Sequence, residues 1–427
     1  MERNDPRYQA YVEILKEELI PAMGCTEPIA LAYAAAKARE VLGVLPDSVQ
    51  LQVSGSIIKN VKSVIVPNTG HLKGMEAAVA AGIIAGSAEK ELEVISEVSE
   101  EKKSAIRDYL QTVPITIEHT EQGHVFDIIV TERCGQDYAR VRIADYHTNI
   151  CRIEKNGTVL YEVPLLDETV QEDARADRSL LNMQDIWDFA ETADLRDVAD
   201  LLERQIRYNN AIAEEGLLGD YGANIGRVLL TTYGNDVSNR AKAKAAAGSD
   251  ARMNGCELPV IINSGSGNQG ITTSVPVIVY ARELGVSDET LLRALTLSNL
   301  TTIHEKTPIG RLSAYCGAIS AGAGAGAGIA YLCGGDYDAV IHTVVNALAV
   351  VSGVICDGAK ASCAAKIATA VEAGLLGYNM YIRGNQFRAG DGIVAKGVEN
   401  SLKNVGRLGK QGMKETNNEI IAIMVGC

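Results

Sequence analysis

Residues 316–335 read CGAISAGAGAGAGIAYLCGG, a run dominated by alternating glycine and alanine without a charged side chain. Glycine and alanine are only weakly apolar, and Asp336 follows directly, so a packed internal helix or glycine-rich turn is favoured over a membrane span. Small side chains let neighbouring helices approach one another closely. The run therefore predicts the tightly packed centre of a helical unit.

Beyond this run, the hydrophobic pattern stays helical through most of residues 167–427. Residues 46–166 instead contain alternating β-branched runs such as Val49–Val53. We expect an α+β protein: an Ala/Gly-rich helical catalytic domain with an inserted or adjacent α/β domain. The predicted domains are 1–45, N-terminal helices that belong with the helical domain, then 46–166 and 167–427.

Four finer expectations concern single segments. Residues 61–66 are rich in β-branched side chains and predict a strand, while residues 222–246 predict one continuous helix. Residues 397–414 are rich in glycine and lysine and predict a loop-like tail. The acidic segment 167–177 predicts a solvated connection between the two larger units.

The charge balance limits the partners that the chain can bind. The formal net charge is −14, and phosphate binding draws on clustered Lys and Arg, so we expect no nucleic acid and no anionic membrane as a partner. The N-terminal residues are polar and do not resemble a secretory signal. The nine cysteines form no disulfide framework, so we expect a reducing cytoplasm. Acidic cytosolic enzymes with large helical surfaces often form symmetric dimers, and we expect a homo-oligomer.

Three cysteines stand out beside glycines: Cys316, Cys356 and Cys363. Their separations, 40 and 7 residues, match neither a CxxC pair nor a zinc-finger pattern. Spacing alone leaves two interpretations open, thiolate ligands of a metal cluster or small buried hydrophobic side chains.

Three strings carry a more specific signal: PAMGCTEP at 21–28, RLSAYCG at 311–317 and CDGAKASC at 356–363. Together and in this order they closely resemble the L-cysteine desulfidase family, which is related to the alpha chain of iron-sulfur L-serine dehydratases. The resemblance covers nearly the whole chain. It implies an oxygen-sensitive [4Fe-4S] enzyme that converts L-cysteine to hydrogen sulfide, pyruvate and ammonia without pyridoxal phosphate.

The resemblance also implies roles for the cysteines. Cys316, Cys356 and Cys363 would hold the [4Fe-4S] cluster and leave one iron open as a Lewis acid. Asp357 and Lys360, inside the ligand string, would orient the ligands and tune the cluster. Related serine dehydratases can place a C-terminal cysteine on the open iron of the resting enzyme. Cys427 is therefore a hypothetical resting-state ligand, against the default of a disordered terminus.

A base is needed to remove the α-proton. Cys25 precedes a predicted helix whose N-terminus would favour a thiolate, and the resemblance makes it the first candidate. Glu27 is the competing base, or it is a carboxylate that caps the helix. If Cys25 were instead a fourth ligand, the cluster would have no open iron.

The string NSGSGNQG at 263–270 precedes another predicted helix. Its glycines permit close approach to exposed backbone N–H groups, and it matches neither a Walker sequence nor a dinucleotide fingerprint. It is an ordinary turn or a substrate-carboxylate cradle, and the resemblance favours the cradle, whose residues would be Ser264, Gly265, Ser266, Gly267, Asn268 and Gln269. Lys306 and Arg311 would pair with the carboxylate or the cluster, or they are solvated charges at a helix end. Ser54, Asn60 and Lys62 are candidates to face the same cleft.

The leading hypothesis is thus a cytoplasmic carbon-sulfur lyase that acts on L-cysteine. An iron-sulfur L-serine dehydratase is its near neighbour, since it performs the same elimination with water as leaving group. In a pyridoxal-phosphate lyase, residues 263–270 would hold the phosphate, but no lysine stands in a recognisable cofactor motif. A non-enzymatic redox sensor is disfavoured because nothing resembles a DNA-binding module.

Overall fold

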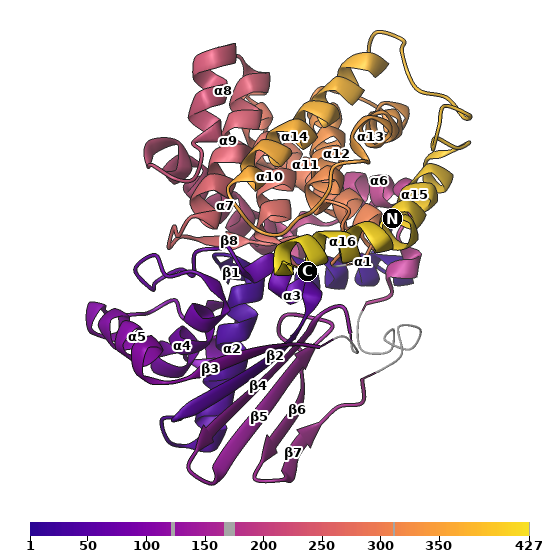
Figure 1. Cartoon of the computed structure of the whole chain (residues 1–427). Helices are drawn as coiled ribbons and strands as arrows, with labels where there is room; N and C mark the ends of the chain where they lie inside the picture. Colours follow the sequence, from indigo (N-terminus) through magenta and orange to yellow (C-terminus); the bar gives the residue numbers. More distant parts are fainter. Residues whose placement is uncertain (121–123, 166–175, 311, 427) are drawn as a thin grey trace.

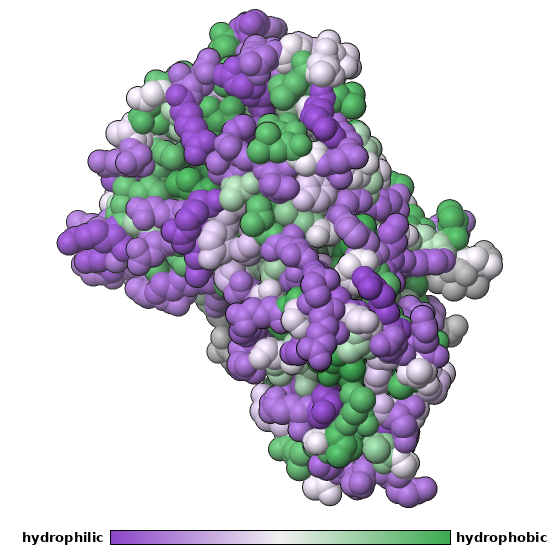
Figure 2. All heavy atoms as spheres, turned by 90° about the vertical axis from the view of Figure 1, so that its left-hand side faces the viewer, coloured by the Kyte–Doolittle hydropathy of each residue, from purple (hydrophilic) through white to green (hydrophobic). Residues whose placement is uncertain are grey.

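The computed structural model describes residues 1–120, 124–165, 176–310 and 312–426 of the chain. A helical part lies above a strongly twisted sheet in the view of Figure 1. The described chain is 59% helical and contains a mixed sheet of six strands, which confirms the α+β class. On the face drawn in Figure 2, hydrophobic side chains form scattered patches within a largely hydrophilic surface.

The six-stranded sheet has the order β3-β2-β4-β5-β6-β7, with β2 and β3 parallel and every other neighbouring pair antiparallel. Val49, Leu51 and Val53 of β2 are buried and alternate with more exposed glutamines, as expected for a sheet with one covered face. The strands are β2 (Ser48–Ser54), β3 (Ile115–Thr120), β4 (Asp127–Cys134), β5 (Asp137–Ala144), β6 (Ile150–Lys155) and β7 (Thr158–Glu162).

Helix α2 covers the sheet, packing against β4, β5 and the helix α4. The predicted strand at 61–66 is wrong, because the chain turns from β2 directly into the short helix α3. Val61, Val64 and Val66 of this segment are buried, and Ile65 forms an isolated antiparallel bridge with Lys73 rather than part of a strand. The helices of this half are α2 (Thr26–Leu42), α3 (Gly55–Val61), α4 (Gly74–Ala85), η1 (Ala88–Glu93) and α5 (Glu100–Thr112).

The glycine–alanine run forms helix α12 (Gly317–Leu332), which packs against four other helices, so the predicted packed internal helix is confirmed. A Cβ atom on Gly322 would lie 2.4 Å from the carbonyl oxygen of Ala370, so the helix contact requires glycine there. No described helix has the length and apolar character needed to cross a membrane. The four helices are α10 (Gly267–Leu284), α11 (Asp288–Lys306), α13 (Tyr337–Val351) and α14 (Ser362–Tyr381).

Two expectations for the helical part are wrong. The helix predicted at 222–246 is broken at Gly234, where φ is +91°, and Asp236 caps the helix that follows. The tail at 397–414 is not a loop, because Leu402 and Val405 place a buried stripe on helix α15. The elements concerned are α8 (Ile225–Tyr233), α9 (Val237–Met253), α15 (Val398–Arg407), η5 (Leu408–Gly412) and α16 (Lys414–Val425).

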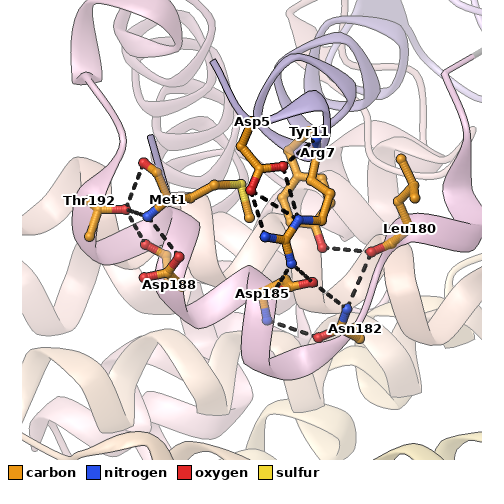
Figure 3. A network of polar contacts seen from close by, with 9 residues as sticks. All are labelled: Met1, Asp5, Arg7, Tyr11, Leu180, Asn182, Asp185, Asp188 and Thr192. Carbon is orange, nitrogen blue, oxygen red and sulfur yellow. Dashed lines mark hydrogen bonds and ion pairs between the residues drawn. The ribbon is translucent and has the colours of Figure 1, made fainter. Parts of the chain in front are cut away.

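The N-terminal helix α1 (Pro6–Glu18) docks on the helical part, as Figure 3 shows. Arg7 Nη1 donates to both carboxylate oxygens of Asp185 on α6 (Met183–Thr192), at 2.8 and 2.9 Å. The Tyr11 hydroxyl donates to the Leu180 carbonyl at 2.9 Å. The short turn η3 (Arg178–Leu180) precedes α6, and a second short turn, η4 (Leu195–Asp197), joins α6 to helix α7 (Ala199–Leu218). Most of the acidic segment 167–177 lies outside the described residues.

Candidate active site

The described residues line a cavity with about 700 Å³ of empty space, part of it open to solvent. Several stretches that are far apart in the sequence contribute to its wall. The lining residues that the sequence had predicted are Cys25, Glu27, Asn60, Ser266, Asn268, Gln269, Lys306, Cys316, Cys356 and Cys363. Tertiary folding therefore brings the predicted base, loop and ligand candidates to one place.

A two-stranded antiparallel sheet brings the first two stretches together. Strand β1 (Pro21–Met23), which leads to Cys25, pairs with β8 (Pro259–Ile261), which leads to the glycine-rich loop. Just beyond the strands, the Thr26 hydroxyl donates to the Gly265 carbonyl at 3.1 Å. The position of Cys25 relative to the loop is thus held by backbone pairing.

Backbone pairing also holds two of the cysteines. Tyr315 forms an antiparallel bridge with Ile355. On either side of it, the Cys316 amide donates to the Val354 carbonyl at 3.2 Å, and the Cys356 amide donates to the Ala314 carbonyl at 2.6 Å. Cys316 caps α12, and Cys363 lies in the first turn of α14, where helix N-termini favour negative charge.

The loop between Cys356 and Cys363 lies against helix α3. Gly358 has a φ of +95°, and a Cβ there would lie 2.0 Å from the Lys59 carbonyl oxygen. The buried Lys59 Nζ donates to the Cys356 carbonyl at 3.3 Å and to Asn417 Oδ1 on α16 at 2.7 Å. Burial lowers the pKa of Lys59. Lys59 therefore joins the cysteine loop to the C-terminal helix, a role that no local pattern indicated.

The three thiols fit an iron-sulfur cluster by their chemistry. Burial, together with the charges of Cys356 and Cys363, raises the pKa of Cys316 to about 12, so the three groups interact electrostatically. Within the described ranges, no three His, Cys, Asp or Glu side chains are arranged to hold a single metal ion. In a [4Fe-4S] cluster each thiolate binds a different iron, so the ligands do not share one ion. The donor set is thus of the kind that such a cluster uses.

Positive charges lie beside these thiols. Asp357 pairs with Lys366, and with Lys360 at 3.0 Å, so both residues predicted to tune the cluster belong to one ion-pair group in the ligand loop. The charge of Lys366 favours the thiolate forms of Cys316 and Cys363. This group would offset part of the negative charge of a thiolate-bound cluster.

Cys25 immediately precedes helix α2, as predicted, and it forms a hydrogen-bonded pair with Glu27. The Cys25 thiol donates to Glu27 Oε2 at 3.1 Å, and Asn60 Nδ2 donates to Glu27 Oε1 at 3.0 Å. Burial and the Glu27 charge raise the pKa of Cys25, opposite to the thiolate expected from the helix start. Burial disfavours the charge of Glu27, but the neighbouring His147 and the hydrogen bond from Cys25 bring the pKa of Glu27 down to about 2.

Of the other predicted site residues, some line the cavity and some do not. Ser264 lies in the glycine-rich loop but its hydroxyl donates to Asn263 at 2.8 Å. Gly265 and Gly267 shape this loop without being among the described residues that line the cavity. Lys306, at the end of α11, donates to the Gly310 carbonyl. Arg311 and Cys427 lie outside the described residues.

Sequence reasoning missed Lys59, His147 and Arg252. His147, between β5 and β6, is 5% exposed, and its Nε2 lies 3.9 Å from Glu27 Oε1. Arg252, near the end of α9, lines the cavity. The polar side chains of these three residues stand in no motif, so only their buried positions, which the sequence does not reveal, mark them.

Comparison with known proteins identifies the family of this chain. The family model of the serine dehydratase alpha chain matches residues 89–422. A UPF0597 protein of Desulfitobacterium hafniense (strain Y51) is 61% identical over 425 residues, covering 100% of this chain and 98% of that protein. A UPF0597 protein of Lachnoclostridium phytofermentans is 51% identical over 418 residues, covering 98% and 100%. The chain therefore belongs to the serine dehydratase alpha chain family and is an iron-sulfur serine dehydratase-like protein.

Proposed function

We propose that this chain is a [4Fe-4S]-dependent L-cysteine desulfidase, a lyase that eliminates sulfide from L-cysteine. The observation that carries the proposal is the single cavity lined by three cysteines, the Cys25–Glu27 pair and unpaired amide groups. Cys316, Cys356 and Cys363 would hold the cluster. When bound, the cluster supplies one Lewis-acidic iron that carries no thiolate from these three residues.

The reaction converts L-cysteine and water to pyruvate, ammonia and hydrogen sulfide. The Cα–H bond breaks, its electron pair forms the Cα=Cβ double bond, and the C–S bond breaks as sulfide leaves. The resulting aminoacrylate tautomerises to an imine, which water hydrolyses to pyruvate and ammonia. No oxidant or reductant is consumed, so the protein must supply proton transfer and positioning.

The Cys25–Glu27 pair is suited to this proton transfer. With the pKa of Glu27 lowered to about 2 and that of Cys25 raised, the resting pair is a carboxylate that accepts a hydrogen bond from a thiol. We propose that Glu27 receives the thiol proton as Cys25 accepts the α-proton of the substrate. Asn60 donates to the second carboxylate oxygen, which keeps Glu27 oriented toward Cys25, and His147 Nε2 lies 3.9 Å from the same oxygen.

An L-serine dehydratase is the second candidate, and the family model favours it. Water would then leave in place of sulfide, with the same proton transfer at Cys25. The test is to measure sulfide, ammonia and pyruvate released anaerobically from L-cysteine and L-serine. A higher kcat/KM for L-cysteine supports the desulfidase, and a higher value for L-serine assigns the dehydratase.

A second measurement tests the cofactor. Protein purified without oxygen should show a broad visible absorption band, with iron and sulfide content to match, and the band should shift when L-cysteine is added. Colourless, iron-free protein that still releases sulfide would overturn the cluster assignment. Borohydride trapping of a cofactor–lysine adduct would then establish pyridoxal-phosphate chemistry.

We also propose that Cys427 would be a further ligand of the cluster in the resting enzyme. The described chain supports this only in that α16, the last helix, packs against α3 beside the cysteine loop. A chain that lacks Cys427 should show an altered resting cluster spectrum. Unchanged spectra and kinetics would remove the proposal.

A further inference from the structure

Arg252 is a buried cation without a counterion among the described residues. Its side chain is 2% exposed, and it ranks among the largest fully buried side chains of the chain. Its Nε and Nη2 atoms have no hydrogen-bond partner within the described ranges. Leaving N–H groups of a buried guanidinium unpaired is costly, so such a residue in a native fold calls for an explanation.

The location of Arg252 supplies one. The residue lines the cavity together with Cys25, the proposed base, and Cys363, one proposed cluster ligand. A ligand bound in this cavity would meet the cation directly.

The two unpaired atoms also define the shape of the ligand group. Nε and Nη2 lie on the same edge of the planar guanidinium, and their N–H bonds point in parallel. This edge matches the two oxygens of a carboxylate in a bidentate pair. A monovalent single-atom anion offers only one acceptor atom and would not match both N–H groups of this edge.

Acceptor atoms in the same cavity complement this cation. Asn268 Oδ1 and Gln269 Oε1 are buried atoms without a hydrogen-bond partner among the described residues, and both side chains line the cavity. A substrate ammonium group carries three N–H donors and no acceptor. The cavity thus offers a guanidinium with two parallel N–H donors and amide oxygens as acceptors. This pattern suits a zwitterionic amino acid.

The glycine-rich loop seats the cation. A Cβ atom on Gly267 would lie 2.2 Å from Arg252 Nε and 2.7 Å from its Cζ, so any side chain there would displace the guanidinium. Gly267 is thus needed for the position of Arg252. The carboxylate cradle expected from the loop's own backbone is in this way extended by a side chain from α9.

We infer that Arg252 binds the α-carboxylate of the substrate and that Asn268 and Gln269 accept hydrogen bonds from its ammonium group. This inference rests on the proposed elimination from a small L-amino acid. It assigns the orientation of that substrate: the carboxylate faces α9, and the amino group faces the start of α10.

The test uses three probes that cannot undergo the elimination: L-alanine, propionate, which lacks the ammonium group, and ethylamine, which lacks the carboxylate. Their dissociation constants are measured anaerobically by calorimetry on cluster-loaded protein. Arg252→Gln should weaken the binding of L-alanine and propionate by roughly 100-fold and leave the binding of ethylamine unchanged. Gln269→Leu should weaken the binding of L-alanine and ethylamine but not the binding of propionate. Arg282→Gln, at an exposed arginine outside this cavity, is the matched control.

Arg252→Lys keeps the charge but removes the two parallel N–H donors, so it should fold and still bind L-alanine about 10-fold more weakly than the wild type. Equal binding of L-alanine by the wild type and both Arg252 variants would overturn the inference while leaving the proposed function intact. Reduced iron content with unchanged binding would show that Arg252 serves the thiolates instead. Wild-type protein that neither binds L-alanine nor turns over L-cysteine or L-serine would overturn the proposed function itself.

Discussion

The Sγ atom of Cys25 lies 3.1 Å from Oε2 of Glu27, inside a cavity whose other wall carries the three clustered cysteines. The second oxygen of Glu27 is held by Asn60 at 3.0 Å. A thiol and a carboxylate that share one hydrogen bond can pass a proton between them without solvent. This relationship distinguishes Cys25 from the cysteines assigned to the cluster.

Replacing either partner should stop proton transfer without removing the cluster. Cys25→Ala and Glu27→Gln should each lower kcat by about 10²- to 10⁴-fold, as expected when a general base is lost. Anaerobic turnover assays and visible spectra check this. Cys151→Ala, at a buried cysteine whose thiol donates to the Arg142 carbonyl, is the control. A Cys25→Ala protein that loses its iron would instead make Cys25 a fourth ligand.

The ligand assignment predicts a clear difference between cysteines. Single serine substitutions at Cys316, Cys356 and Cys363 should each remove most of the iron and abolish turnover, because a [4Fe-4S] cluster depends on its thiolates. Iron analysis and the visible band provide the measurement. Cys256→Ser and Cys333→Ser should retain full iron content. Normal iron in any of the first three variants would remove that residue from the ligand set.

Lys59 should control how well the ligand loop holds its cluster. Lys59→Met leaves the Cys356 carbonyl and Asn417 without their donor, which should cost about 1–3 kcal/mol of folding free energy. We expect the visible band to bleach several-fold faster in air. Asn417→Leu breaks only the contact of Lys59 with α16, so the visible band of this variant should bleach more slowly than that of Lys59→Met. Identical bleaching of wild type and Lys59→Met would argue against this role.

Glu132 should make the stability of the fold fall as pH rises. It is fully buried on β4, neither carboxylate oxygen has a partner among the described residues, and burial raises its pKa well above the ordinary value of 4.5. The unfolded chain loses this proton near pH 4.5 while the folded chain keeps it, so stability decreases above that pH.

Glu132→Gln removes this titration. At pH 7 it should raise the free energy of unfolding by about 1–3 kcal/mol, and near pH 4 the gain should vanish because both states are then protonated. Urea unfolding at the two pH values measures the effect, with the exposed Glu101→Gln as control. A gain of equal size at both pH values would contradict the explanation.

Local patterns predicted many elements well. Strand β2 forms where the run Val49–Val53 predicted it, and α12 forms where alternating glycine and alanine require close packing. The failures share a cause. The segment at 61–66 has strand-like composition but pairs only through an isolated bridge between Ile65 and Lys73, and α15 forms because Leu402 and Val405 find a buried surface that composition does not report.

Local features of the sequence predict the α+β class, the three cysteine-bearing motifs and the start of a helix just after Cys25, because these depend on periodicity, capping and residue type along the chain. Tertiary folding alone pairs β1 with β8, joins the cysteine loop to α16 through Lys59, brings His147 within 3.9 Å of Glu27 and places Arg252 in the wall of the cavity that Cys25 also lines. The physical reason is that burial and long-range pairing set the hydrogen-bond partners and charges of these groups. Residues separated by more than a hundred positions leave no local pattern that records such contacts.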